Sequence, residues 1–182
     1  MNVLRGEQCS LRSWRLQDAL LLPDLANDAE VARYTAPRFP YPYRLHDAQA
    51  WVRLHHDAEP TLNFAVEYQG ALAGGIGLIP GDAELGRAGV ASIGYWLGRR
   101  FWGKGIAVDA VTLLSEHAFT TLRVRRLWAN VMAPNLASAR VLEKAGFRRE
   151  ATLRGALVDR TGGIHDELIY VRFAGGVTME NG

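Results

Sequence analysis

Two patterns of apolar residues follow one another in the middle of this 182-residue chain. Residues 93–97 form a short apolar run of strand length, and a turn rich in glycine and arginine comes after it. Beyond the turn, apolar residues recur at intervals of three and four, on one face of a helix: Ala107, Val111, Leu114, Ala118 and Leu122. The pattern therefore predicts a strand, a tight turn and an amphipathic helix.

The N-terminal third predicts one strand and three helices. The strand is expected over residues 7–15, and the helices over 17–26, 28–35 and about 47–57. Asp28 and Asp47 are candidate caps of the second and third helices. We expect the third helix to bury Ala50, Trp51 and Leu54. Its preceding segment, residues 36–43, combines prolines with aromatic residues, and it can be either packing material or the wall of a substrate pocket.

The rest of the chain predicts six strands and one more helix. The strands are expected over residues 61–68, 71–79, 90–97, 126–132, 147–158 and 164–173. The first two and the last two read as hairpins, and a helix capped by Asn135 ends at Gly146. We therefore expect one mixed α+β domain over residues 1–182, with a frayed tail over 174–182.

Composition narrows the class of protein. A content of 48% hydrophobic and 22% charged residues is typical of a globular domain, and a net charge of +2 does not itself indicate nucleic acid as a partner. The single cysteine, Cys9, cannot form an internal disulfide, and its place in a predicted strand favours a buried thiol over a nucleophile. The first residues lack the apolar core of a signal peptide, and no run approaches the roughly 18 apolar residues of a membrane helix. We expect a cytoplasmic protein.

The turn after the central strand has the residues of a phosphate-binding site. Gly103 and Gly105 would let a ligand approach the backbone where the first N–H groups of the helix are unpaired and its dipole is positive. Arg99, Arg100 and Lys104 add positive charge. The alternative is a solvated basic turn that binds nothing.

Two phosphate motifs overlap in this turn. Gly98-x4-Gly103-Lys104 matches a P-loop, but Gly105 stands where a Ser or Thr would bind magnesium. No later strand ends in an Asp that would supply a second magnesium ligand. The other motif, Arg100-x-x-Gly103-x-Gly105, resembles the coenzyme A pyrophosphate signature of the GNAT acetyltransferase superfamily.

Further motifs extend this resemblance over nearly the whole chain. Asn135-x-x-Ser138, followed by Gly146-Phe147, is similar to the helix that GNAT proteins place after their fifth strand. Several short motifs resemble those of the ribosomal-protein N-terminal (alanine/serine) acetyltransferase branch: Leu11-Arg-x-Trp14, Asp18-Ala19, Ile93-Gly94-Tyr95-Trp96, Trp102-Gly-Lys-Gly105, Gly163-x-His165-Asp166 and Tyr170.

The resemblance implies a fold and a cosubstrate. The fold is a mixed, mostly antiparallel sheet flanked by helices, whose fourth and fifth strands, here residues 90–97 and 126–132, splay apart around acetyl-CoA. No metal is implied, and His46, His55 and His56 lack partners at metal-ligand spacing. A homodimer through the closing strands is possible on the family's pattern. The residues implied in coenzyme binding are Tyr95, Trp96, Leu97, Arg99, Arg100, Trp102, Gly103, Lys104, Gly105, Ile106, Ala107, Asn135 and Ser138.

Acetyl transfer to an amine sets the catalytic roles. The amine must lose a proton, the tetrahedral oxyanion must be stabilised, and the departing thiolate benefits from a proton. The catalytic candidates are Ser138, as proton donor to the thiolate, and Tyr95, through backbone N–H groups at the splay. Many relatives carry a carboxylate just before the Ile-Gly-Tyr motif, where this chain has Ser92. The remaining candidates for a base are Glu67, Glu84, Asp166 and His165.

We therefore expect an N-acetyltransferase that transfers acetyl from acetyl-CoA to a primary amine in a ternary complex. The acceptor is a protein N-terminal α-amine or a small-molecule amine. The lower pKa of an α-amine, near 8 against about 10.4 for lysine, favours the former where no strong base is present. Two alternatives stay open, namely a larger donor such as succinyl-CoA, and a non-catalytic module that only binds coenzyme A.

Overall fold

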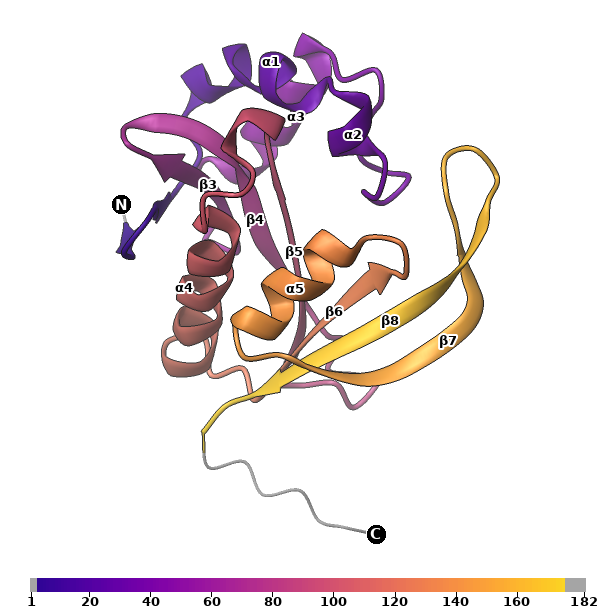
Figure 1. Cartoon of the computed structure of the whole chain (residues 1–182). Coiled ribbons are helices and arrows are strands. Elements are labelled where there is room, and N and C mark those ends of the chain that lie inside the picture. Colours follow the sequence, from indigo (N-terminus) through magenta and orange to yellow (C-terminus); the bar gives the residue numbers. More distant parts are fainter. Residues whose placement is uncertain (1–2, 176–182) are drawn as a thin grey trace, which may run out of the picture.

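An eight-stranded sheet in the order β1-β2-β3-β4-β5-β6-β8-β7 forms the centre of the protein (Figure 1). The computed structural model describes residues 3–175. Neighbouring strands are antiparallel except for β5 and β6, which are parallel. The strands are β1 (Leu4–Arg5), β2 (Ser10–Arg12), β3 (Asn63–Tyr68), β4 (Ala71–Pro80), β5 (Val90–Leu97), β6 (Arg126–Met132), β7 (Arg148–Val158) and β8 (Ile164–Phe173). The predicted mixed, mostly antiparallel α+β fold is confirmed.

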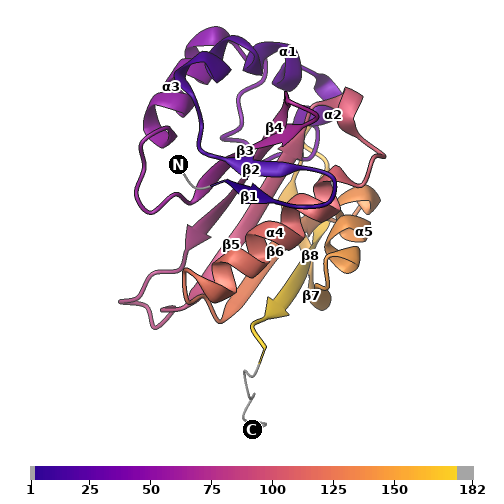
Figure 2. The same ribbon diagram turned by 90° about the vertical axis from the view of Figure 1, so that its left-hand side faces the viewer.

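Helices cover both faces of this sheet. Helices α4 (Ile106–Thr120) and α5 (Leu136–Lys144) lie on one face (Figures 1 and 2). The N-terminal helices lie across the upper end of the opposite face: η1 (Leu16–Leu20), α1 (Leu22–Ala26), α2 (Ala29–Ala32) and α3 (Leu45–His55). A 3-10 turn, η2 (Arg99–Phe101), connects β5 to α4. Among the described residues, no helix combines the length and apolar character that crossing a membrane requires.

The apolar stripe predicted for the central helix faces the core. Ile106, Val111 and Leu114 of α4 are buried against the sheet, and α4 begins at Ile106 directly after the glycine-rich turn. Burial of such aliphatic side chains stabilises the fold by roughly 1.5–3 kcal/mol each. The strand, the turn and the start of the helix therefore lie where the hydrophobic pattern predicted, whereas the helix ends at Thr120, before Leu122, the last residue of the predicted stripe.

Two N-terminal predictions need correction. Helix α3 buries Ala48 and Val52, whereas all three residues expected to be buried are exposed: Ala50, Trp51 (38%) and Leu54 (70%). The helix begins at Leu45 rather than near Asp47, because the Asp47 carboxylate accepts a hydrogen bond from Arg44 N at 2.8 Å and closes the turn two residues earlier. Residues spaced by four, at 48 and 52, then face η1 and the core.

The first strand is also shorter than predicted. Its expected range of 7–15 narrows to Ser10–Arg12, because residues 6–9 form a turn in which Gly6 N donates to Cys9 O at 2.9 Å. The Asp109 carboxylate of α4 accepts hydrogen bonds from Gln8 N and Cys9 N, both at 2.9 Å. The turn is thereby attached to the first turn of α4. Cys9 is buried there, as expected.

The single helix expected over residues 17–26 is divided into η1 and α1, and the helix expected over 28–35 is shorter, Ala29–Ala32. The remaining predicted elements agree with the structure. Asp28 caps α2 by accepting from Glu30 N at 2.8 Å, and the hairpins β3–β4 and β7–β8 form as expected. Strand β6 spans the predicted residues, and α5 begins after Asn135. The predicted frayed tail falls, from residue 176 onward, outside the described residues.

Candidate active site

Strands β5 and β6 pair over only part of their length. Their register joins Val90 to Arg126 and Ser92 to Trp128, and then the pairing stops. Past that point β5 stays paired with β4, and β6 stays paired with β8. We call residues 93–97 of β5 and 129–132 of β6 the splay. The backbone groups that face each other across it have no strand partner within the described part of the chain, so the predicted separation of these strands is confirmed.

The side chain of Tyr95 reaches from β5 to the first turn of α5. Its hydroxyl lies 2.8 Å from Ser138 Oγ and donates to Ser138 O at 3.2 Å. Ser138 is held in turn by Asn135, the N-cap of α5, whose side chain accepts a hydrogen bond from Ser138 N at 3.2 Å. The two predicted catalytic residues therefore meet at the splay. Sequence reasoning placed only the backbone of Tyr95 there and missed its phenol.

This phenol keeps its proton. Burial raises the pKa of Tyr95 to about 12, although its hydrogen bond with Ser138 acts in the opposite direction. At neutral pH the pair therefore consists of two protonated hydroxyls. Such a pair can donate a proton toward a group placed in the splay, and the phenol can replace the proton that the serine gives away.

The glycine turn has the geometry expected of an anion site. Gly103 and Gly105 have φ values of 73° and 77°, in the left-handed region that favours glycine. Gly105 is the N-cap of α4, and no side chain caps this helix end. The first N–H groups of a 15-residue helix are thus free of side-chain caps and lie at the positive end of its dipole.

The cationic side chains of the turn lie beside aromatic rings and carboxylates. Lys104 Nζ is 5.7 Å from the ring centroids of both Tyr68 and Phe101. Arg99 and Arg100 line a cavity of about 390 Å³, whose other lining residues are Asp24, Leu25, Asp28 and Gly98. Two carboxylates thus share this cavity with the predicted phosphate-binding arginines.

Four further residues predicted to bind coenzyme A are Trp96, Trp102, Ile106 and Ala107, and their side chains lie in different surroundings. The Trp102 indole donates to Leu97 O at 2.8 Å and so folds the turn onto the end of β5. Ile106 is buried in the core, and Ala107 is half-buried, so their backbone N–H groups are what the turn presents. Trp96 points to the sheet face opposite Tyr95, because side chains alternate along a strand.

The face that carries Trp96 is lined by aromatic rings and glycines. The Phe39 ring, from the segment that the sequence left open as filler or pocket wall, packs edge-on against Trp96 with centroids 5.4 Å apart. Gly94 of β5 lies on this face, and a side chain added there would meet open space. The floor of the sheet beside the splay is therefore bare at that position.

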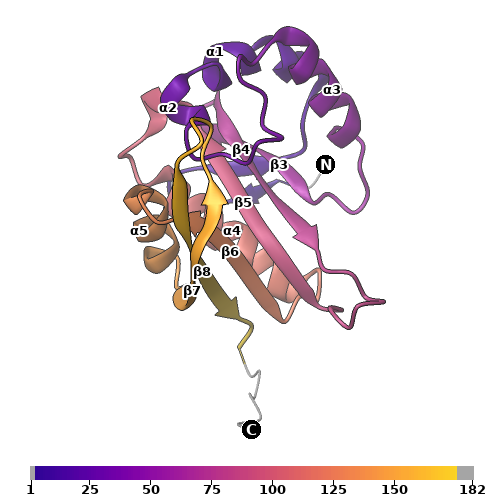
Figure 3. The same ribbon diagram turned by 90° about the vertical axis from the view of Figure 1, so that its right-hand side faces the viewer.

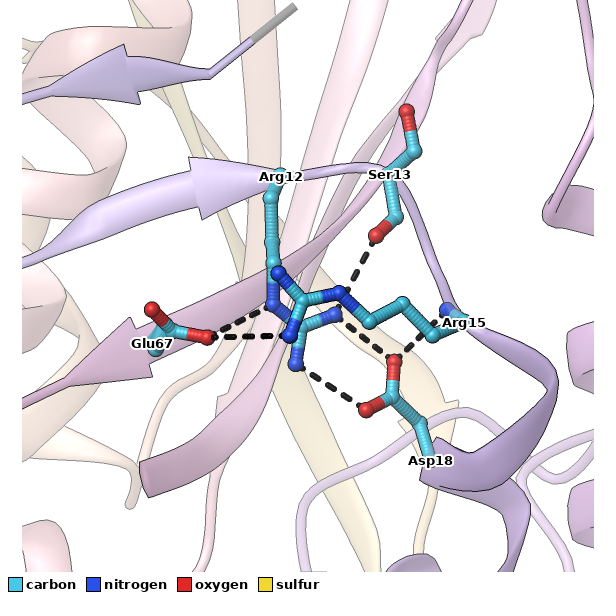
Figure 4. A network of polar contacts seen from close by, with 5 residues as sticks. All are labelled: Arg12, Ser13, Arg15, Asp18 and Glu67. Atoms are coloured by element: carbon cyan, nitrogen blue, oxygen red, sulfur yellow. Dashed lines mark hydrogen bonds and ion pairs between the residues drawn. The ribbon is translucent and has the colours of Figure 1, made fainter. Parts of the chain in front are cut away.

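Glu67, a candidate base, belongs to a buried ion network (Figure 4). Arg12 donates to Glu67 Oε2 at 2.7 Å and to the two Asp18 oxygens at 2.7 and 2.9 Å. Burial by itself lowers the pKa of Arg12, but its hydrogen bonds to Asp18 and Glu67 outweigh burial and raise it. Glu67 thus has a structural partner, and the network joins β2, β3 and η1.

Of the other candidate bases, Asp166 and His165 have hydrogen-bond partners elsewhere, and Glu84 lies in an exposed loop. Asp166 Oδ1 accepts from Gly155 N at 2.9 Å, and His165 Nε2 lies 2.8 Å from Asp159 Oδ2. Glu84 lies exposed in the loop between β4 and β5. Over residues 3–175, no group of three His, Cys, Asp or Glu side chains is arranged to hold a metal ion.

Comparison with known proteins identifies the family. A family model described as "Acetyltransferase (GNAT) domain" matches residues 9–148. The chain is 32% identical over 171 residues to the uncharacterized N-acetyltransferase p20 of Bacillus licheniformis, covering 87% of this chain and 93% of that protein. It is 29% identical over 149 residues to spermidine N(1)-acetyltransferase of Escherichia coli (strain K12), covering 79% and 74%.

A solved structure shows the same fold. RimL, a ribosomal L7/L12 α-N-protein acetyltransferase in complex with coenzyme A, superposes with a TM-score of 0.79 at 22% identity, covering 95% of this chain and 98% of that chain. The family model spans most of the sequence, and p20 matches nearly the full length of both proteins. The chain therefore belongs to the GNAT acetyltransferase family.

Proposed function

We propose that this protein transfers the acetyl group of acetyl-CoA to a primary amine, and that a protein N-terminal α-amine is the preferred acceptor. The observation that carries the proposal is the splay, where unpaired backbone of β5 lies beside the Tyr95–Ser138 hydroxyl pair. RimL, which has this fold, is in complex with coenzyme A, and the family is one of acetyltransferases.

The proposed binding mode follows from the direction of the elements. The diphosphate of coenzyme A lies at the glycine turn, on the backbone N–H groups at the start of α4, with Lys104 and the arginines 99 and 100 nearby. The pantetheine arm lies in the splay along residues 95–97. This arrangement brings the thioester sulfur toward Ser138 and its carbonyl toward the backbone of β5.

The proposed reaction is direct attack. The amine nitrogen bonds to the acetyl carbon, a backbone N–H of β5 stabilises the oxyanion, and the C–S bond then breaks. The thiolate takes the Ser138 hydroxyl proton, and the protonated Tyr95 phenol, 2.8 Å away, returns a proton to the serine. The nitrogen loses its extra proton to water, because Ser92 stands where a carboxylate was expected, and the Tyr95 phenolate regains a proton from water, which restores the enzyme. An amine that is already partly neutral is therefore favoured.

The test is release of free coenzyme A thiol from acetyl-CoA with a panel of acceptors. The panel holds peptides with a free α-amine, the same peptides with a blocked N-terminus and a lysine, and spermidine. Turnover with the free α-amine peptides supports the proposal. Binding of acetyl-CoA without turnover of any amine favours a non-catalytic module, and faster turnover with succinyl-CoA favours the larger acyl donor.

A further inference from the structure

The loop that joins β7 to β8 is ordered by one carboxylate. Asp159 Oδ1 accepts hydrogen bonds from Thr161 N at 2.8 Å and Gly163 N at 2.9 Å, while Oδ2 lies 2.8 Å from His165 Nε2. The hydrogen bond from His165, together with those from residues 161 and 163, holds the pKa of this carboxyl well below its usual range. The carboxyl is therefore ionised at neutral pH, and its hydrogen bonds close the loop on both sides of the next residue, Arg160.

Arg160 connects this loop to a segment more than a hundred residues earlier in the chain. Its Nε donates to Ala32 O at 2.9 Å. Its Nη2 lies within hydrogen-bond distance of Thr35 Oγ1 and Ala36 O, both at 3.2 Å, and of Phe39 O at 2.5 Å. Figures 1 and 3 show the tip of the β7–β8 hairpin beside α2. We call this set of contacts between Arg160 and residues 32–39 the clasp.

The clasp ends at the residue that packs on the splay. Phe39, whose carbonyl Arg160 binds, has its ring against Trp96, the neighbour of Tyr95. Tyr95 points toward α5, where the thioester sulfur is placed under the proposed function, and Trp96 points to the opposite face. An amine must reach the carbonyl carbon from a side that the coenzyme leaves open. The face that carries Trp96, Phe39 and the bare Gly94 is that side.

We propose that Arg160 is a positioning residue for the amine acceptor. It holds residues 32–39 so that Phe39 stays against Trp96 and forms a fixed wall of the acceptor site, and it does not contact the reacting atoms. This inference rests on the proposed function. Three carbonyls and a hydroxyl gathered on one guanidinium fix a loop that lacks regular secondary structure of its own beyond α2.

Two measurements test the clasp, and the first needs no activity. Arg38 is exposed within the held segment, so trypsin cleavage after Arg38, followed by mass spectrometry, reports how often the segment opens. We expect Arg160→Ala to accelerate this cleavage about fivefold or more, and Arg160→Lys to do so less. The matched control is Arg154→Ala, which removes an exposed arginine of β7. Unchanged cleavage in Arg160→Ala would overturn the clasp.

The second measurement is the kinetics with acetyl-CoA and an alanine-initiated hexapeptide. We expect Arg160→Ala to raise the KM for the peptide about tenfold, with acetyl-CoA affinity by calorimetry unchanged and partial recovery in Arg160→Lys. Because Arg160 acts through Phe39, the double variant Arg160→Ala/Phe39→Ala should be little worse than Phe39→Ala alone.

Three outcomes contradict the role. An unchanged peptide KM despite faster cleavage would show that the clasp does not serve the acceptor. Additive effects of the two substitutions, or a loss seen only with acceptors that carry a carboxylate, would assign Arg160 to direct acceptor binding instead. If the wild-type protein turns over no amine, the proposed function fails, and the trypsin comparison alone decides whether the clasp exists.

Discussion

The hydroxyls of Tyr95 and Ser138 lie 2.8 Å apart and join β5 to α5 across the splay. The two residues are 43 positions apart in the sequence, so the fold brings them together. The contact exists because α5 begins directly after β6, beyond the point where β6 has separated from β5. The hydroxyl pair therefore forms at the place where the two strands separate.

Removal of the serine hydroxyl should impair turnover more than binding. We expect Ser138→Ala to lower kcat about 10- to 100-fold while the Kd for acetyl-CoA changes less than about threefold, because the proton is needed only as the C–S bond breaks. Tyr95→Phe should lower kcat less, and the double variant should be no worse than the product of the two. Equal losses in kcat and in affinity by calorimetry would contradict the proton-donor role.

The glycine turn offers a matched pair of substitutions. Gly103 and Gly70 both have positive φ, 73° and 79°, and both have open space where a Cβ would lie. Alanine at either position should cost about 1 kcal/mol in the free energy of unfolding, measured by urea denaturation. Only Gly103→Ala should weaken acetyl-CoA binding, by about tenfold, since Gly70 lies in the β3–β4 hairpin. Equal affinity in both variants would remove the diphosphate from this turn.

The pH dependence of kcat/KM should reflect ionisation of the amine substrate and not of a group on the enzyme. The pKa of Tyr95 is raised to about 12, so the phenol stays protonated well above neutral pH. With a peptide α-amine as acceptor, kcat/KM should rise with pH and level off above the amine's own pKa of about 8. No falling limb should appear up to about pH 10. A decline below pH 9 would show that a different enzyme acid carries the reaction.

The same phenol should influence stability at high pH. A tyrosine whose pKa is near 12 in the folded protein and about 10 when unfolded binds more protons in the folded state between those values, so stability falls as pH rises through that window. The loss should be at most about 2–3 kcal/mol for this group and smaller in Tyr95→Phe, as measured by urea denaturation at pH 9 and 11. An equal loss in both proteins would mean that the phenol is not buried.

Removal of one residue from the buried ion network should lower the free energy of unfolding far more than removal of one residue from an exposed ion pair. Arg12 and Asp18 are 5% and 2% exposed, so Asp18→Ala leaves a guanidinium buried without its bidentate partner. We expect a loss of about 3–5 kcal/mol in the free energy of unfolding. Glu30→Ala, which breaks the exposed Arg33–Glu30 pair, is the control and should cost less than about 1 kcal/mol. Similar small losses in both would contradict the burial of the network.

Local patterns predicted most of the fold. The apolar stripe of α4, the Asn135 cap and the glycine turn are encoded by residues close in sequence, and the structure has them at the predicted positions. The error in α3 arose because its buried face, Ala48 and Val52, is less hydrophobic than the exposed Trp51 and Leu54. Burial there depends on packing against η1, which periodicity does not report.

The site was predictable only in part, for a related reason. Glycines with positive φ are visible in a motif, whereas the partners of a side chain depend on strand register. Register places Tyr95 toward α5 and Trp96 toward Phe39. It also brings Glu67 next to Arg12, and the resulting ion pair means that Glu67 is not a free carboxylate available as a base. Arg160 gave no sequence signal, because three of its four acceptors are backbone carbonyls.

The burial of Cys9 has a practical outcome for measuring this enzyme. Burial, with the nearby Asp109 charge, raises the pKa of its thiol to about 12, so it does not ionise under ordinary assay conditions. It is the chain's sole cysteine, and colorimetric disulfide reagents react with thiolates. Any colour that develops in a continuous recording will therefore come from liberated product, without a contribution from the protein's own sulfur.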